Sequence, residues 1–167
     1  MTPASLILGL ITLQRLAELV LARHNTRKLL ARGAIEIGAG HYLLVVSVHV
    51  AWLISLWVFG RNQEVNLPML ALFIALQGLR GWIMSTLGTR WTTRIIIVPG
   101  EPRIKSGPYR IMPHPNYALV VAEISVFPLA LNLPILALIF TILNAAVLAI
   151  RIPVEERALL QLTRSDS

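Results

Sequence analysis

The sequence predicts an all-α, polytopic membrane protein with about five transmembrane helices in a single domain, residues 1–167. Hydrophobic residues make up 56% of the 167 residues and charged residues only 14%, whereas roughly a quarter of a soluble domain is charged. The apolar residues also form runs long enough to cross a bilayer, which takes about 20 residues per helix. The chain has no cysteine, which excludes disulfides and thiol chemistry.

The predicted spans are five apolar stretches: about residues 3–22, 41–59, 67–87, 117–131 and 134–150. The first has no basic segment before it and is interrupted by Gln14, Arg15 and Glu18, so we expect a retained helix and not a cleaved signal peptide. The last two belong to one stretch that is too long for a single crossing. Pro134 near its middle favours two helices joined by a tight turn, and one long kinked helix is the alternative.

The segment of residues 88–116 is the longest that is not apolar. It contains the turn signals Pro99-Gly100 and Gly107-Pro108. Its β-branched part, Thr92 to Val98, predicts a short extended segment. Loops of this length in compact domains are usually functional or disordered, and the aromatic and β-branched residues favour order here. We expect the last residues, 162–167, to be frayed.

Basic residues indicate the orientation. One side of the predicted membrane holds twelve of them and the other side holds only Arg61; the twelve are Arg23, Arg27, Lys28, Arg32, Arg90, Arg94, Arg103, Lys105, Arg110, Arg151, Arg157 and Arg164. Cytoplasmic loops carry the excess of Lys and Arg. We therefore expect the N-terminus outside and the C-terminus in the cytoplasm, in a bacterial inner membrane. The same placement explains the net charge of +7 without a nucleic-acid partner, for which no motif is present.

Polar residues recur inside the predicted spans at helical spacing: Arg15 with Glu18, Gln77 with Arg80, Asn116 with Glu123, and Asn144 with Arg151. Charges in lipid are costly and need a partner or a function. Most of these residues fall in the cytoplasmic half of their spans, which predicts a polar cavity open to the cytoplasm. The alternative is that they only hold helices together. The lone His49 is expected to be a packed or hydrogen-bonded core residue. No metal site is expected, because the four histidines lack zinc-type spacing.

Two motifs could carry chemistry. Residues 107–117 read Gly-Pro-Tyr-Arg-Ile-Met-Pro-His-Pro-Asn-Tyr. Pro115 suits the first position of a helix, with His114 as the N-cap, and such a helix start favours an anion. The second motif places Glu155 and Glu156 just past the fifth span, beside that start if the last two spans form a hairpin. Such a site suits the zwitterionic, cationic S-adenosylmethionine; a capped helix beside a solvated charge run is the equal alternative.

The pattern Gly-Pro-Tyr-Arg…His-Pro-Asn-Tyr…Glu, followed by Arg…Glu-Glu-x-x-Leu, resembles the isoprenylcysteine carboxyl methyltransferase family. The resemblance is strongest over residues 88–160. The N-terminal part looks like a bacterial branch of the family, some members of which methylate alkylpyrone-type lipids. Members are integral membrane enzymes that use S-adenosylmethionine. The resemblance thus implies a pocket for this cofactor, formed by the 88–116 loop and the C-terminal helix.

The resemblance also implies roles for individual residues. The cofactor-binding residues would be Tyr109, His114, Pro115, Tyr117 and Glu156. The residues at the reacting groups would be Arg151 and Glu155, and those on the substrate side would be Arg80 and Glu123. One departure is Pro113, which stands where the family usually has a basic residue before the His-Pro; Arg110 or Arg94 are candidates to replace that cation.

We therefore expect an S-adenosylmethionine-dependent O-methyltransferase. Its substrate would be lipophilic, isoprenylcysteine-like or alkylpyrone-like, with a carboxyl or an enol or phenol oxygen as the methyl acceptor. The lipid would enter sideways from the membrane, which makes membrane lipid and a lipophilic or prenylated molecule the expected partners. The rival interpretations are a non-enzymatic membrane scaffold and a small transporter. The sequence does not define the oligomeric state.

Overall fold

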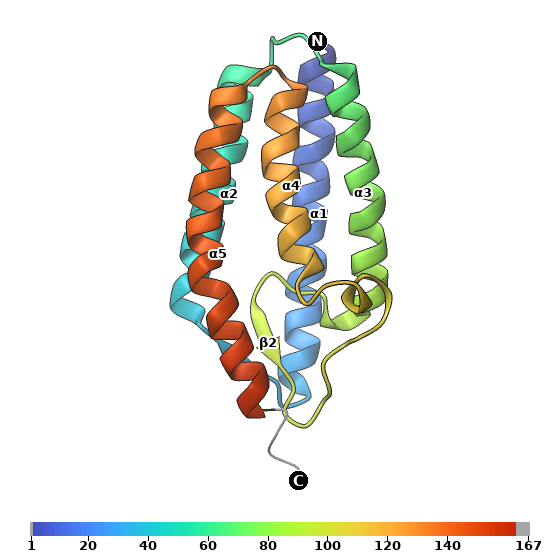
Figure 1. Cartoon of the computed structure of the whole chain (residues 1–167), viewed down its shortest axis with the longest axis vertical. Coiled ribbons are helices and arrows are strands. Elements are labelled where there is room, and N and C mark those ends of the chain that lie inside the picture. Colours follow the sequence, from blue (N-terminus) through green and yellow to red (C-terminus); the bar gives the residue numbers. More distant parts are fainter. Residues whose placement is uncertain (1, 163–167) are drawn as a thin grey trace.

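The structure is a computed structural model that describes residues 2–162. Five helices run along one long axis (Figure 1). They are α1 (Pro3–Ala31), α2 (Ala39–Gly60), α3 (Leu67–Leu87), α4 (Pro115–Ala130) and α5 (Pro134–Leu162). The N-terminus lies at one end of this bundle and α5 finishes at the other (Figure 1), which we call the C-terminal end. Of the residues expected to be frayed, Leu162 is the last of α5 and residues 163–167 lie outside the described part.

Four of the five helices, α1, α2, α3 and α5, are long and apolar enough to cross a membrane. Many of their large apolar side chains are exposed, as expected for a lipid-facing surface. The helix α4 has 16 residues and a length of about 24 Å, which is shorter than a hydrocarbon core of about 30 Å. It packs between α3 and α5. Four of the five predicted spans are thus helices long enough to cross a membrane. The remaining one, α4, is a shorter apolar helix.

The helices α1 and α5 continue beyond the apolar stretches that mark them in the sequence. Each has 29 residues, or about 43 Å, so each projects past a bilayer core at the C-terminal end. The helix α5 continues through Pro153, which no local signal at that point predicts. Glu155 and Glu156 therefore lie on α5. The expectation that they follow the end of the fifth helix was wrong.

The turn between α4 and α5 confirms that the long apolar stretch forms two helices. Asn132 has a positive φ of 54°, and Leu133 donates its backbone N–H to the carbonyl of Pro128 at 2.9 Å. The start of α4 also follows the prediction, since His114 is the N-cap and Pro115 opens the helix. The two helices form a hairpin, and the start of α4 lies beside α5, which continues past it toward the C-terminal end (Figure 1).

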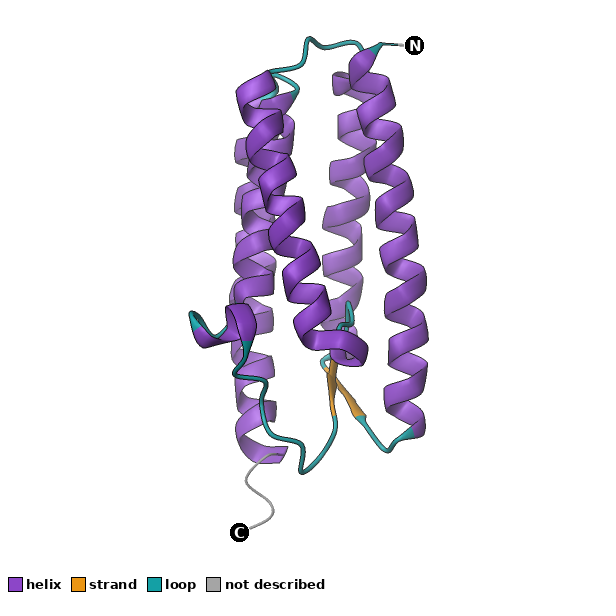
Figure 2. Cartoon of the chain, turned by 90° about the vertical axis from the view of Figure 1, so that its right-hand side faces the viewer, coloured by secondary structure: helices purple, strands orange, loops and turns teal. Residues whose placement is uncertain are grey.

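A short two-stranded antiparallel sheet lies at the C-terminal end (Figure 2). The strand β2 (Ile95–Ile97) is the extended segment that the sequence predicts. It pairs with β1 (Ile35–Ile37), so that Ile35 faces Ile97; β1 was not predicted, and the fold is not purely α-helical. Ile95 and Ile97 pack against Ala158 of α5. Two short 3₁₀ helices, η1 (Gly88–Arg90) and η2 (Gly107–Arg110), complete the 88–114 segment.

The opposite half of the bundle is closed by an apolar core. Phe127 of α4 is fully buried and its ring lies 4.6 Å from that of Phe73 and 5.9 Å from that of Trp52. Leu8 and Leu56 join the same cluster. Space for ligands is therefore concentrated in the half of the bundle that contains the 88–114 segment.

Candidate functional site

Two neighbouring cavities occupy this part of the molecule, and the second extends to the apolar core at Trp52. The first, which we call the loop cavity, has a volume of about 160 Å³ and lies between β2, the loop after it, the start of α4 and α5. The second, which we call the bundle cavity, has a volume of about 280 Å³ and lies among the helices. Four residues line both cavities: Thr92, Asn116, Tyr117 and Arg151. The two cavities therefore meet where the start of α4 faces α5.

The start of α4 is tied to α5 through His114. Its Nε2 lies 2.6 Å from Oε1 of Glu156, and Arg103 donates to the same oxygen at 2.8 Å. Arg103 also donates to the carbonyl of Pro113 at 2.8 Å. These contacts fix the N-cap of α4 against α5 and bring a cation beside it. Glu156 itself lines neither cavity; it holds His114, which lines the loop cavity.

A second chain of hydrogen bonds crosses the point where the cavities meet. The hydroxyl of Tyr117 donates to a carboxylate oxygen of Glu155 and accepts from Nε of Arg151 at 2.9 Å. Arg151 also donates through Nη2 to the carbonyl of Thr93 at 2.7 Å. Within residues 2–162, Nη1 of Arg151 has no hydrogen bond and Glu155 accepts one only from Tyr117. Both groups therefore have free capacity for a ligand.

Tyr109, in η2, also lines the loop cavity. Burial, and then the nearby charge of Glu155, raise the pKa of Tyr109 to about 12. Its hydroxyl is therefore neutral at physiological pH and can donate a hydrogen bond into the cavity. Pro115, directly before the shared wall, is buried and lines neither cavity.

The bundle cavity has a mostly apolar wall with a few polar groups. Its lining includes Leu16 of α1 and Val50 of α2, which are also 55% and 50% exposed. These two side chains face the surface that lipid would cover. The cavity therefore reaches the lipid-facing surface along α1 and α2.

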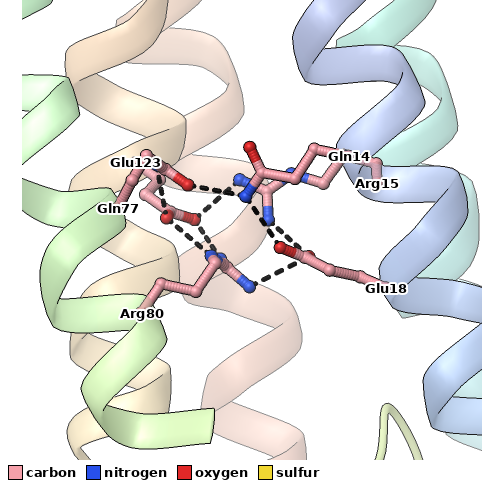
Figure 3. Close-up of polar contacts among 6 residues, drawn as sticks. All are labelled: Gln14, Arg15, Glu18, Gln77, Arg80 and Glu123. Atoms are coloured by element: carbon pink, nitrogen blue, oxygen red, sulfur yellow. Dashed lines mark hydrogen bonds and ion pairs between the residues drawn. The ribbon is translucent and has the colours of Figure 1, made fainter.

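An ionic network between α1, α3 and α4 (Figure 3) contributes four of the residues that line the bundle cavity. Glu123 of α4 accepts from Arg80 through both of its oxygens and from Arg15 at 3.0 Å. Glu18 accepts from Arg15 at 2.8 Å and from Arg80 at 3.1 Å. Two arginines and two glutamates thus neutralise one another between α1, α3 and α4.

Two glutamines complete this network. Gln77 donates to Glu123 at 2.9 Å, and Gln14 donates to Glu18 and to Gln77. The expected pairing of Arg15 with Glu18 is confirmed. Glu123 and Arg80 are 2% and 6% exposed. They form a buried ion pair, so neither charge is free.

The residues selected from the sequence thus fall into three groups. Tyr109, His114, Tyr117, Arg151 and Glu155 line the loop cavity. Pro115 and Glu156 support its wall. Arg80 and Glu123 line only the bundle cavity, and Glu123 follows Asn116 of the shared wall by two helical turns of α4.

Sequence reasoning missed Arg103. Pro113 stands where the family usually has a basic residue, and Arg103 provides a cation beside His114 instead. Arg94 and Arg110 were the candidates expected for this role. Arg94 instead pairs with Glu36 at 2.7 Å. Local spacing could not identify Arg103, because the loop carries five basic residues and its path places only this one against Glu156.

The fold and the cavities define a helical integral membrane protein in which a cavity with many polar side chains meets a more apolar, lipid-reaching cavity. The sequence model of the isoprenylcysteine carboxyl methyltransferase (ICMT) family matches residues 69–161. The protein YpbQ of Bacillus subtilis is 37% identical over 159 residues, which cover 92% of this chain and 95% of YpbQ. A protein of Haemophilus influenzae is 26% identical over 151 residues, covering 87% of this chain and 88% of its own length. Both relatives are described as uncharacterized.

No solved structure matches the chain significantly. The chain belongs to the isoprenylcysteine carboxyl methyltransferase family, as the two sequence motifs indicated. The family match includes all of α4 and the cavity-lining part of α5.

Proposed function

We propose that this protein is an S-adenosylmethionine-dependent O-methyltransferase that methylates a carboxyl, enol or phenol oxygen of a lipophilic molecule. The observation that carries the proposal is the contact between a polar cavity and a lipid-reaching cavity at Tyr117 and Arg151. Family membership supports methyl transfer as the reaction class. Cofactor and acceptor would then meet at the wall that the two cavities share.

The groups around the loop cavity fit the charges of S-adenosylmethionine. The cofactor has a carboxylate, an ammonium and a sulfonium. The start of α4 offers free backbone N–H groups, which favour the carboxylate. Glu155 keeps acceptor capacity for the ammonium, and Tyr109 can donate to a polar atom of the nucleoside. His114 and Tyr117, whose rings stack 5.3 Å apart, would form the side wall.

When bound, the cofactor supplies an electrophilic methyl group. The protein's task is then to place an oxygen in line with it, and positioning is the main contribution that we assign to the chain. Nη1 of Arg151 would hold the acceptor oxygen, while the bonds to Tyr117 and Thr93 fix the guanidinium. A carboxylate acceptor needs no base, and an acidic enol needs little help, whereas a phenol, which ionises near pH 10, would pass its proton to a base such as the neighbouring Glu155.

The acceptor would enter from the membrane. The lining of the bundle cavity by the exposed Leu16 and Val50 supports a lateral entrance along α1 and α2. Arg80 and Glu123 already satisfy each other, so we assign them to the inner wall on the substrate side and not to the reacting groups. The excess of basic residues at the C-terminal end supports a cytoplasmic position for the loop cavity, from which the cofactor would enter.

A binding titration of S-adenosylmethionine on the purified protein tests this proposal. We expect saturable binding that His114→Ala and Glu156→Ala each weaken by about tenfold or more, while both variants still insert into membranes. Arg157→Ala is a matched control, because this exposed residue also lies on α5 but lines neither cavity. Absence of saturable binding to the wild type would favour the scaffold or transporter interpretation. Unchanged binding in both variants would show that the cofactor site lies elsewhere.

A further inference from the structure

Three buried hydrogen-bond donors in the bundle cavity have no partner within residues 2–162; one, Nε1 of Trp91, lies beside Thr92 at the shared wall, and the other two lie away from that wall. Nδ2 of Asn144 on α5 and Nε1 of Trp52 on α2 are both without a hydrogen bond within residues 2–162. The two residues are 2% and 3% exposed, and both line the bundle cavity. Buried polar groups in native proteins nearly always have a partner. A ligand that binds in this cavity together with a small rotation of these side chains would supply the missing acceptor.

His49 adds a complementary group to the same cavity. Its Nδ1 lies 2.8 Å from the backbone carbonyl of Val45. Because a carbonyl only accepts, Nδ1 must carry the hydrogen, and Nε2 of the neutral ring is then an acceptor. No residue among 2–162 forms a hydrogen bond with Nε2. His49 lines the bundle cavity, so it offers an acceptor to complement the donors of Asn144 and Trp52.

These three groups lie away from the place where the cavities meet. Asn144 precedes Arg151 by seven residues on α5, which is two helical turns or about 10 Å along the helix. Asn144 lines only the bundle cavity, whereas Arg151 lines both. Asn144 therefore lies about 10 Å deeper in the bundle than the proposed point of methyl transfer, and His49 and Trp52, which also line only the bundle cavity, lie on the neighbouring helix α2.

We propose that His49, Trp52 and Asn144 form a second polar subsite, which binds a hydroxyl group of the lipophilic acceptor about 10 Å from the oxygen that is methylated. A hydroxyl donates to Nε2 of His49 and accepts from both Asn144 and Trp52 through its two lone pairs, so one group satisfies all three residues. The acceptor would then be a lipid with two oxygen functions, not a lipid with a single polar head.

The surrounding charges favour a neutral group over an ion. The neighbouring network contains two arginines and two glutamates, and all four charges are already paired. A further charge in this apolar environment would have no counterion. A hydroxyl needs only the hydrogen bonds that the three residues offer. The subsite rests on the proposed function in one respect, because its distance of about 10 Å is measured from the oxygen that would be methylated.

The test compares two probes in detergent micelles without S-adenosylmethionine. One probe is para-dodecylphenol, and the other carries an additional chain hydroxyl at about 10 Å from the phenol oxygen. Calorimetry measures the affinity of each. We expect the wild type to bind the hydroxylated probe about tenfold more tightly. Asn144→Leu and Trp52→Phe should each lose most of this preference while binding para-dodecylphenol as the wild type does.

The matched control is Thr141→Val, which removes a hydroxyl from α5 one turn away from Asn144. Thr141 pairs with Ser125 and lines neither cavity, so the preference should survive. Equal binding of both probes by the wild type, or a preference retained in Asn144→Leu and Trp52→Phe, would overturn the subsite. If Asn144→Leu does not fold, Trp52→Phe decides the question alone.

Methylation of the probes separates this inference from the proposed function. A protein that prefers the hydroxylated probe, but transfers no methyl group to either probe from S-adenosylmethionine, has the subsite and lacks the proposed activity. A protein that methylates both probes equally well at limiting concentration has the activity and lacks the subsite.

Discussion

Removing the charge of Glu123 should destabilise the folded protein strongly. Its carboxylate accepts two hydrogen bonds from Arg80, one from Arg15 and one from Gln77. Glu123→Gln leaves two arginines with Glu18 as their only counterion among the residues of the network. Breaking a buried ion pair from one side costs about 3–5 kcal/mol, and we expect a cost of this size. Arg80→Met should cost a similar amount, because it leaves Glu123 with Arg15 alone.

The double variant, Arg80→Met with Glu123→Gln, should cost less than the sum of the single variants by about 2–3 kcal/mol. The free energy of unfolding is measured by titration of detergent-solubilised protein with dodecyl sulfate. Arg23→Met, an exposed change on α1, serves as the control and should change stability by less than about 0.5 kcal/mol. Additive costs of Arg80 and Glu123 would show that the two charges do not depend on each other, and would refute the network as the element that holds α1, α3 and α4.

Three further predictions concern the loop cavity and its supports. Tyr117→Phe removes the hydroxyl that links Arg151 to Glu155. It should lower kcat of methyl transfer by about tenfold or more and change cofactor affinity by less than about twofold. A change in cofactor affinity with kcat unchanged would contradict this role. Gly107→Ala should lower stability by about 1–3 kcal/mol, because a Cβ there would lie 2.5 Å from Oγ1 of Thr86 at a φ of 54°. Gly33 also has a positive φ, of 86°, but open space around it, so Gly33→Ala should destabilise the protein less than Gly107→Ala in a thermal melting assay. Equal destabilisation would show that the contact with Thr86 contributes nothing. The pKa of Tyr109 is raised to about 12, while an unfolded tyrosine ionises near pH 10. Stability should therefore fall between about pH 10 and 12, and a series of melting temperatures in Tyr109→Phe should show a smaller fall.

The sequence predicts features that depend on residues close together in the chain. Pro134 divides the last apolar stretch, and Pro115 opens α4 with His114 as its cap, because proline restricts a helix wherever it occurs. Arg15 and Glu18 pair because three residues bring two side chains to one helix face. These are local rules, and the structure follows them.

Features that depend on the path of the whole chain were not accessible in this way. The partner of Arg80 lies 43 residues away on another helix, and β1 pairs with a strand about 60 residues later. Arg103 reaches Glu156 only because the loop turns back under α4. The unpartnered groups of Trp52 and Asn144 become visible only when burial and hydrogen bonds are known. The sequence therefore identifies residues of the candidate site better than it identifies their partners.

The most direct measurement is the transfer of a labelled methyl group. Membranes with the protein are incubated with S-adenosylmethionine that carries a labelled methyl, and the lipids are then extracted. We predict label on a lipid carboxyl, enol or phenol oxygen, and loss of most of this label in Arg151→Met although the cofactor still binds. Binding of the cofactor without label in any lipid, or full labelling by Arg151→Met, would contradict methyl transfer at the contact between the two cavities.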